Sequence, residues 1–173
     1  MNSLQHFSKV KAFAFDVDGV LTDGTVYVQG NGVQARRMNI KDGLALQMAL
    51  KNGYPVKIIS GAVSAEVLDR LKKLGLTDIE MGVKDKKKAI QEFLSKHNLT
   101  PNQLLFMGDD LPDIDLLKLV GLPCCPSDAV QEVMDVCLYI SSKPGGMACV
   151  RDVIEKVLKL NGHWNWNTEI ASR

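Results

Sequence analysis

Three segments of the chain are apolar over several consecutive positions, without the polar and apolar alternation of a half-exposed strand. They cover residues 12–15, 54–59 and 103–107. Such runs are typical of strands buried on both faces, as in the middle of a parallel sheet. Shorter strands are predicted at residues 77–81, 123–126 and 136–140.

Segments with helical spacing of apolar residues separate these strands. They predict helices over residues 41–52, 62–74, 127–134 and 150–160, and a further helix that starts in the lysine-rich stretch 84–88. Asp42 is the expected N-cap of the first of these helices. Because strands alternate with helices, the pattern predicts a three-layer, Rossmann-like α/β domain with a central parallel sheet.

Residues 25–40 depart from this alternation, because β-forming residues flank the sequence Gln-Gly-Asn-Gly. This arrangement predicts two antiparallel strands joined by a tight turn. The hairpin is attached to the loop that follows the first buried strand. The connections between the later strands are too short for an inserted cap domain.

The size and charge of the chain narrow the choice of function. Its 173 residues, 19.0 kDa, are expected to form one domain over residues 1–173. Lys and Arg number 21 against 20 for Asp and Glu, which leaves a net charge of +1 and no overall field to attract nucleic acid or an anionic membrane. We find neither a signal-peptide pattern nor a membrane-spanning run, and expect a cytoplasmic protein. The four cysteines, without a C-x-x-C pair, are expected to be buried thiols.

Acidic residues gather where the first buried strand ends. Asp16 and Asp18 follow it at positions i and i+2, so in extended backbone both side chains point to the same side. Two carboxylates this close favour a hard divalent cation such as Mg²⁺, and an Asp can itself attack phosphorus. The alternative is an ordinary D-x-D-G surface turn.

Polar residues also end the other two buried strands. Ser60 and Gly61 precede a predicted helix and can hold a phosphate, although an ordinary serine turn has the same sequence. Asp109, Asp110 and Asp113 follow the third strand, where their charges again favour a cation. Between these two sites, one lysine of the stretch 84–88 is expected to face a transferring phosphoryl group, and the others to face solvent.

The order of these motifs, KAFAFDVDGVLTDG, then Ser-Gly, G-x-x-D-K and G-D-D-x-x-D, resembles the four motifs of the haloacid dehalogenase superfamily of phosphotransferases. The resemblance implies that Asp16 is the nucleophile and Asp18 the general acid/base. It assigns an Mg²⁺ site to Asp16, Asp109 and the backbone carbonyl of Asp18. It further implies phosphate binding by Ser60, Gly61 and Lys86, with Asp113 orienting the lysine and Asp110 in support.

The glycine-rich loop 143–147 and the missing cap resemble the small capless phosphatases that act on 3-deoxy-D-manno-octulosonate 8-phosphate in lipopolysaccharide biosynthesis. This resemblance covers residues 11–160. It implies a homotetramer in which a neighbouring subunit covers the active site. It also implies substrate contacts, which we place at Asp42, Lys143 and Arg151.

Some positions depart from that group. Ala62 stands where these enzymes have Arg after the second motif, and where relatives acting on a nine-carbon keto-acid phosphate have an acidic residue, so the nine-carbon substrate stays an alternative. Met147 and Cys149 replace smaller residues of the loop motif. The tail, residues 161–173, has no counterpart, and its two tryptophans are expected to be docking groups.

Two alternative functions, from other classes of protein, remain open. A phospho-accepting receiver module also has clustered acids and a lysine, but its accepting Asp follows a later strand, where this chain has Ser60 and Gly61. A non-catalytic scaffold would not need the complete set of acidic, hydroxyl and lysine side chains.

Overall fold

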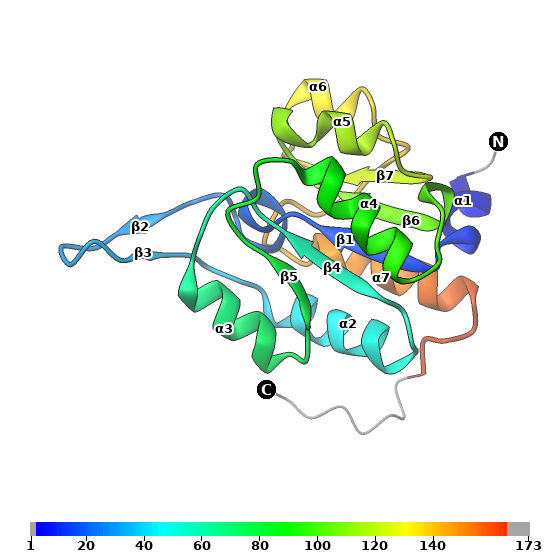
Figure 1. Cartoon of the computed structure of the whole chain (residues 1–173), viewed down its shortest axis with the longest axis horizontal. Coiled ribbons are helices and arrows are strands. Elements are labelled where there is room, and N and C mark those ends of the chain that lie inside the picture. Colours follow the sequence, from blue (N-terminus) through cyan, green and yellow to red (C-terminus); the bar gives the residue numbers. More distant parts are fainter. Residues whose placement is uncertain (1–2, 166–173) are drawn as a thin grey trace.

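The computed structural model describes residues 3–165 and contains a six-stranded parallel sheet (Figure 1). The strands lie in the order β5-β4-β1-β6-β7-β8. Their bounds are β1 Ala12–Phe15, β4 Val56–Ile59, β5 Asp78–Glu80, β6 Leu104–Met107, β7 Leu122–Cys125 and β8 Tyr139–Ile140. Each neighbouring pair is parallel, so the predicted parallel sheet is confirmed.

Helices cover both faces of the sheet and give the three predicted layers (Figure 1). Their bounds are α1 Ser3–Lys9, α2 Ile40–Lys51, α3 Ala65–Lys73, α4 Lys86–Lys96, α5 Ile114–Leu117, α6 Gln131–Met134 and α7 Cys149–Leu160. One core cluster joins α1, α2, α3 and α7 to one face. The other joins α4, α5 and α6 to the opposite face.

The central strand β1 explains why its sequence is apolar throughout. Phe13 and Phe15 point to the face covered by α2 and α7, and their rings stack with centroids 6.0 Å apart. Ala12 and Ala14 point to the opposite face, beneath α4. Since neither face of β1 meets water, the strand carries no polar alternation.

Helix boundaries correct several sequence-based expectations. Helix α2 starts at Ile40, and its N-cap is Asn39, whose side chain accepts the N–H of Lys41 at 2.9 Å, so the prediction of Asp42 as N-cap was wrong. Helix α3 starts three residues later than predicted, at Ala65, because Ser64 caps it through the N–H of Val67. Helix α6 is only four residues long.

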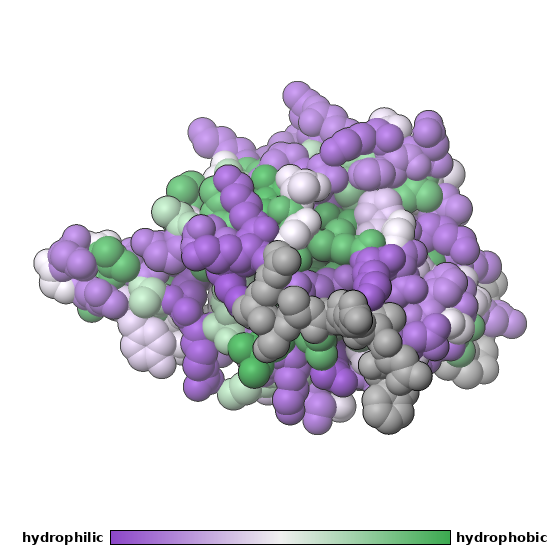
Figure 2. Space-filling view, turned by 90° about the horizontal axis from the view of Figure 1, so that it is seen from below, coloured by the Kyte–Doolittle hydropathy of each residue, from purple (hydrophilic) through white to green (hydrophobic). Residues whose placement is uncertain are grey.

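The hairpin of β2 (Tyr27–Val28) and β3 (Gln34–Ala35) is antiparallel, as predicted, and extends away from the body (Figure 1). A bridge between Thr22 and Met38 closes its base. Most of the face in Figure 2 is hydrophilic, but hydrophobic surface appears on this projection. Val26, Tyr27 and Val28 are exposed there.

The four cysteines are free thiols, and three of them are buried as expected, while Cys137 is half-buried. Over residues 3–165, the longest helices have only 12 residues, and we find no helix with the length and apolarity needed to cross a membrane.

Candidate active site

The carboxyl ends of β1, β4 and β6 meet at one edge of the sheet, where they open into a cavity of about 370 Å³. All fourteen of its lining residues lie in the four predicted motifs or directly beside them, and they include Asp16, Asp18, Ser60, Gly61, Lys86, Asp109, Asp110 and Asp113. The fold thus brings together residues that lie almost one hundred positions apart in the sequence.

Asp16 lines this cavity and is held by hydrogen bonds to both of its carboxylate oxygens. Its Oδ1 accepts the backbone N–H of Val17 at 2.7 Å, and its Oδ2 accepts a hydrogen bond from Lys86 Nζ at 2.7 Å. The side chain of Asp16 is almost buried, since it ends the central strand. These two hydrogen bonds fix the orientation of the Asp16 carboxylate, which lies against the ammonium group of Lys86.

Lys86 connects Asp16 to the acidic loop after β6. Its ammonium group donates to Asp113 Oδ1 at 2.7 Å as well, and Asp113 Oδ2 accepts the N–H of Asp109 at 3.1 Å. Asp113 is 1% exposed, so this buried chain of contacts is shielded from water. Asp110 begins the same loop, where its Oδ1 accepts the N–H of Leu111 at 2.7 Å. The other lysines of the 84–88 stretch are exposed, as expected.

The carboxylates at this edge repel each other despite Lys86. Burial, followed by the charge of Asp113, raises the pKa of Asp16 to about 7, although Lys86 opposes the shift. Burial, followed by the charges of Asp16 and Asp113, raises the pKa of Asp109 to about 7. Burial disfavours the charge on Lys86, but Asp16 and Asp113 outweigh it and raise the lysine pKa.

These carboxylates fit a divalent cation. Oxygen atoms of Asp16, Asp109 and Asp113 lie within 4.8 Å of one another, and within residues 3–165 this is the one group of three potential ligand side chains so close together. Asp113 is 1% exposed and bonded on both oxygens within the chain, whereas Asp16 and Asp109 are more exposed, so we assign the metal to these two carboxylates. Hard oxygen ligands of this kind, with unrelieved negative charge, suit Mg²⁺.

We expect Mg²⁺ to stabilise the protein more at about pH 8 than at about pH 5. Burial raises the folded-state pKa values of Asp16 and Asp109 from 3.8 to about 7. Between these two pH values, the folded protein therefore binds more protons than the unfolded chain does. The metal-free protein therefore loses stability as the pH rises from about 4 through 7, as these carboxylates ionise, and a cation removes that repulsion. Thermal unfolding with and without Mg²⁺ measures the effect.

Asp109→Asn is the matched variant for this prediction. It should raise the melting temperature of the metal-free protein at about pH 8 and remove most of the Mg²⁺ stabilisation. An equal Mg²⁺ shift at both pH values would contradict the assignment.

Ser60 sits at the end of β4 and is 1% exposed. Its Oγ accepts the N–H of Ala62 at 3.1 Å, which is the serine turn considered as the alternative to a phosphate site. The hydroxyl hydrogen is not needed for this turn, so it can still be donated into the cavity. The two interpretations of Ser60 are thus compatible.

Asp18 is held by a residue that the motif analysis did not single out. Arg36, which follows β3 in the hairpin, donates from Nε to Asp18 Oδ1 at 2.6 Å and from Nη2 to Oδ2 at 3.4 Å. The hairpin, residues 25–40, which the family resemblance implies to be a flap beside the active site, therefore contacts Asp18 in the cavity wall through this arginine. The sequence could hardly identify this contact, because Arg36 and Arg37 are adjacent residues of the same type. In the structure only Arg36 is buried and pairs with Asp18, while Arg37 is exposed and pairs with Asp23.

The glycine-rich loop, residues 143–147, packs against the backbone of Val17–Leu21, which is the candidate catalytic loop. Gly146 donates its N–H to the carbonyl of Val20 at 2.9 Å, and Gly145 donates to Asp128 Oδ1 at 2.8 Å. A Cβ atom at Gly145 would overlap the carbonyl group of Gly19. Only glycine lets the two backbones approach so closely.

Gly145→Ala should therefore lower kcat/KM about 100-fold, because it pushes the loop that carries Asp18 and Gly19 out of place. We also expect a loss of about 1 to 3 kcal/mol in the free energy of unfolding. The control is Gly30→Ala, because a Cβ atom there meets open space. Steady-state kinetics and denaturant unfolding of both variants test this, and an unimpaired Gly145→Ala enzyme would refute it.

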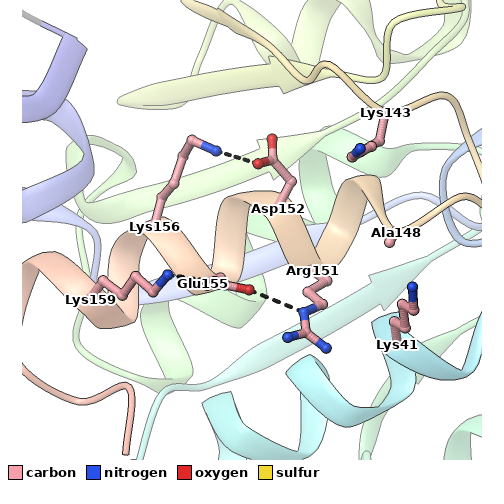
Figure 3. A pocket seen from close by; sticks show the side chains of 8 residues that line it. All are labelled: Lys41, Lys143, Ala148, Arg151, Asp152, Glu155, Lys156 and Lys159. Carbon is pink, nitrogen blue, oxygen red and sulfur yellow. Dashed lines mark hydrogen bonds and ion pairs between the residues drawn. The ribbon is translucent and has the colours of Figure 1, made fainter.

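Lys143 and Arg151, proposed from sequence as substrate contacts, lie outside the Asp16 cavity. They line a second cavity of about 450 Å³, drawn in Figure 3, on the exposed side of α7. Glu155 pairs with Arg151 and Lys159, and Asp152 pairs with Lys156. Within residues 3–165, Lys41 and Lys143 line this cavity without an ion-pair partner, so it is positively charged.

Asp42 requires a correction, because its side chain is 1% exposed and cannot reach a ligand in either cavity. Its Oδ1 accepts the N–H of Arg151 at 2.7 Å, which caps the start of α7 from the neighbouring helix α2. Burial raises the pKa of Asp42 to about 6, against the backbone hydrogen bonds from α7. We reassign Asp42 from substrate contact to a structural cap.

The described part of the tail packs on its own chain. The ring of Trp164 lies 5.5 Å from the guanidinium carbon of Arg151 and packs against the core. The Nδ1 atom of His163 lies 2.8 Å from the hydroxyl of Tyr54. Trp164 therefore docks within the chain, and Trp166 lies outside the described residues.

Comparisons with known proteins agree with this geometry. The family model for haloacid dehalogenase-like hydrolases matches residues 74–146. The 3-deoxy-D-manno-octulosonate 8-phosphate phosphatase of Escherichia coli K12 is 33% identical over 153 residues, which cover 88% of this chain and 81% of that enzyme.

Solved structures of such phosphatases have the same fold. The enzyme from Yersinia pestis superposes with a TM-score of 0.93 at 28% identity, over 97% of this chain and 91% of that one. The enzyme from Moraxella catarrhalis, solved with a magnesium ion, a phosphate ion and a KDO molecule, has a TM-score of 0.88 at 34% identity and covers 91% of both chains.

Proposed function

The chain belongs to the haloacid dehalogenase-like hydrolases, and we propose that it is the Mg²⁺-dependent phosphatase that converts 3-deoxy-D-manno-octulosonate 8-phosphate to the free sugar acid and phosphate. The observation that carries this proposal is the placement of Asp16. It directly follows the central strand, and its carboxylate is bonded to Lys86, lies close to Asp109 and lines an open cavity.

The chemistry assigned to the side chains follows from their positions. Asp16 attacks phosphorus, so that a bond from its carboxylate oxygen forms while the bond to the sugar oxygen breaks. Asp18 gives a proton to the departing sugar oxygen. In the second half-reaction, Asp18 takes a proton from the water that cleaves the aspartyl-phosphate, and Asp16 is regenerated.

Other groups bind the phosphate. The Ser60 hydroxyl, the Gly61 N–H and the Lys86 ammonium group hold its non-reacting oxygens. Asp16, Asp109 and the Asp18 carbonyl would hold Mg²⁺, which supplies positive charge against the phosphate oxygens. Asp113 keeps Lys86 in position.

We further propose that the protein is a cytoplasmic homotetramer. Free cysteines suit a reducing compartment. The open cavity and the exposed Tyr27 and Val28 on the hairpin favour cover by a neighbouring subunit. In that assembly, Lys143 and Arg151 would approach the carboxylate of a substrate bound to the neighbour. Sedimentation velocity tests the oligomer.

Phosphate release from a panel of substrates tests the function. The panel contains the eight-carbon sugar-acid phosphate, its nine-carbon analogue and simple sugar phosphates, each with Mg²⁺. We expect kcat/KM to favour the eight-carbon acid by at least about tenfold. A preference for the nine-carbon acid would support the alternative substrate that Ala62 left open. No phosphate release from any member of the panel would overturn the proposal.

A further inference from the structure

The carboxylate of Asp18 is bonded by Arg36 on both of its oxygens, at 2.6 Å and 3.4 Å. The arginine side chain is 6% exposed, whereas that of Asp18 is 37% exposed. A third donor of the guanidinium, Nη1, reaches the carbonyl of Gln34 at 3.1 Å. All three nitrogen atoms of the Arg36 guanidinium therefore bond groups of this chain. This arrangement does not fit a role in which Arg36 binds the substrate as a free cation.

The backbone around Arg36 is tied to the loop that carries Asp18. Two residues after Arg36, Met38 pairs with Thr22 in an isolated bridge. Thr22 is buried, and its Oγ1 accepts the N–H of Gly19 at 3.2 Å. The base of the hairpin and the catalytic loop therefore form one connected unit, which sets the distance from Arg36 to Asp18.

Asp18 needs such a support because its own loop does not supply one. The next residue, Gly19, has a φ of 78°, so the chain turns away from the strand directly after Asp18. Over residues 3–165, both side-chain hydrogen bonds of this carboxylate come from Arg36. A planar guanidinium that bonds both oxygens fixes the rotation of a carboxylate, which a single point charge does not.

We propose that Arg36 is the positioning residue of Asp18, and that the hairpin thereby controls proton transfer to the leaving group. The inference rests on the proposed function, because it assigns Asp18 the proton-transfer step. Arg36 does not touch the substrate. It holds the carboxylate from the hairpin side, while Asp18 lines the Asp16 cavity on the other.

The test compares two phosphate monoesters whose leaving groups differ in acidity. An alkyl phosphate releases a weakly acidic alcohol that needs a proton from Asp18, whereas p-nitrophenyl phosphate releases an acidic phenol that needs little help. The ratio kcat/KM reports the steps up to cleavage of the ester bond. Asp18→Asn serves as the reference for lost proton transfer.

Arg36→Met should lower kcat/KM about 100-fold for the alkyl phosphate and less than about threefold for the aryl phosphate, the same pattern as Asp18→Asn. Arg36→Lys, which keeps the charge but loses the second bond, should recover part of the alkyl activity. The matched control is Arg37→Met, since Arg37 is an exposed neighbour that pairs with Asp23. It should leave both values unchanged.

Stabilisation by Mg²⁺ in thermal unfolding serves as a second readout. It should be the same in Arg36→Met and wild type, since Arg36 bonds the side-chain carboxylate of Asp18, whereas the proposed metal ligands are Asp16, Asp109 and the backbone carbonyl of Asp18. Equal losses on both esters, or no loss on either, would overturn the positioning role. The eight-carbon sugar-acid phosphate is itself an alkyl ester and serves as the alkyl phosphate of this test, so wild-type protein that is inactive on it would overturn the proposed function itself.

Discussion

Asp16→Asn is expected to lower kcat at least about 10⁴-fold while leaving the protein folded, the largest effect of any single substitution in this chain. An amide oxygen is a poor nucleophile toward phosphorus, and no neighbouring group can take its place. The Asn side chain keeps an oxygen to accept the N–H of Val17, and Lys86 keeps Asp113 as a partner. The substitution also removes a charge that burial disfavours, so the metal-free fold should not be weakened.

Phosphate release, thermal unfolding and sedimentation of the Asp16→Asn variant measure these effects together. Asp115→Asn is a suitable control, because it makes the same change at an exposed position of α5. An inactive variant with an intact assembly separates an enzyme from a scaffold. Turnover within about tenfold of wild type would instead remove Asp16 from the role of nucleophile.

Lys86→Met is expected to have the second largest effect, on both activity and stability. It removes the cation that bonds Asp16 and Asp113, and both carboxylates are almost buried. Breaking a buried ion pair on one side costs about 3 to 5 kcal/mol, because the remaining charges are uncompensated. Loss of a fixed cation beside the phosphate should lower kcat about 10² to 10³-fold.

The pH dependence of the Lys86→Met variant gives a further check. Its loss of stability should shrink as the pH falls below about 7, because a protonated Asp16 no longer needs a cation. Denaturant unfolding at several pH values measures this, with Lys87→Met as the exposed neighbouring control. A constant loss of stability at all pH values would show that Lys86 contributes through packing instead of charge.

Much of the site could be predicted because it depends on strand ends. Buried strands of a parallel sheet carry a distinct apolar pattern, and their carboxyl ends share one edge. Asp16, Ser60 and Asp109 each follow such a strand, so their proximity in space followed from three local patterns. Lys86 was identified through its motif spacing, since charge alone does not distinguish it from Lys87 and Lys88.

Contacts between distant segments could not be predicted in this way. Asp42 looks like the cap of its own helix, but Asn39 takes that place and Asp42 caps α7 instead. Arg36 reaches Asp18 from the base of the hairpin, which the bridge between Thr22 and Met38 closes, and this bridge has no sequence signal. The cap of α7 by Asp42 and the support of Asp18 by Arg36 could thus be identified only from the folded structure.

The packing of Gly145 and Gly146 on the catalytic loop also bears on how the protein is made. On the ribosome, Asp16 leaves the exit tunnel before β6 does, so its strand β1 must wait for β6 to be synthesised before both its edges are paired. The loop that supports it appears later still. A nascent chain released just before Gly145 would contain the proposed catalytic residues and still lack the contact that sets their spacing, so prematurely terminated chains should be inactive.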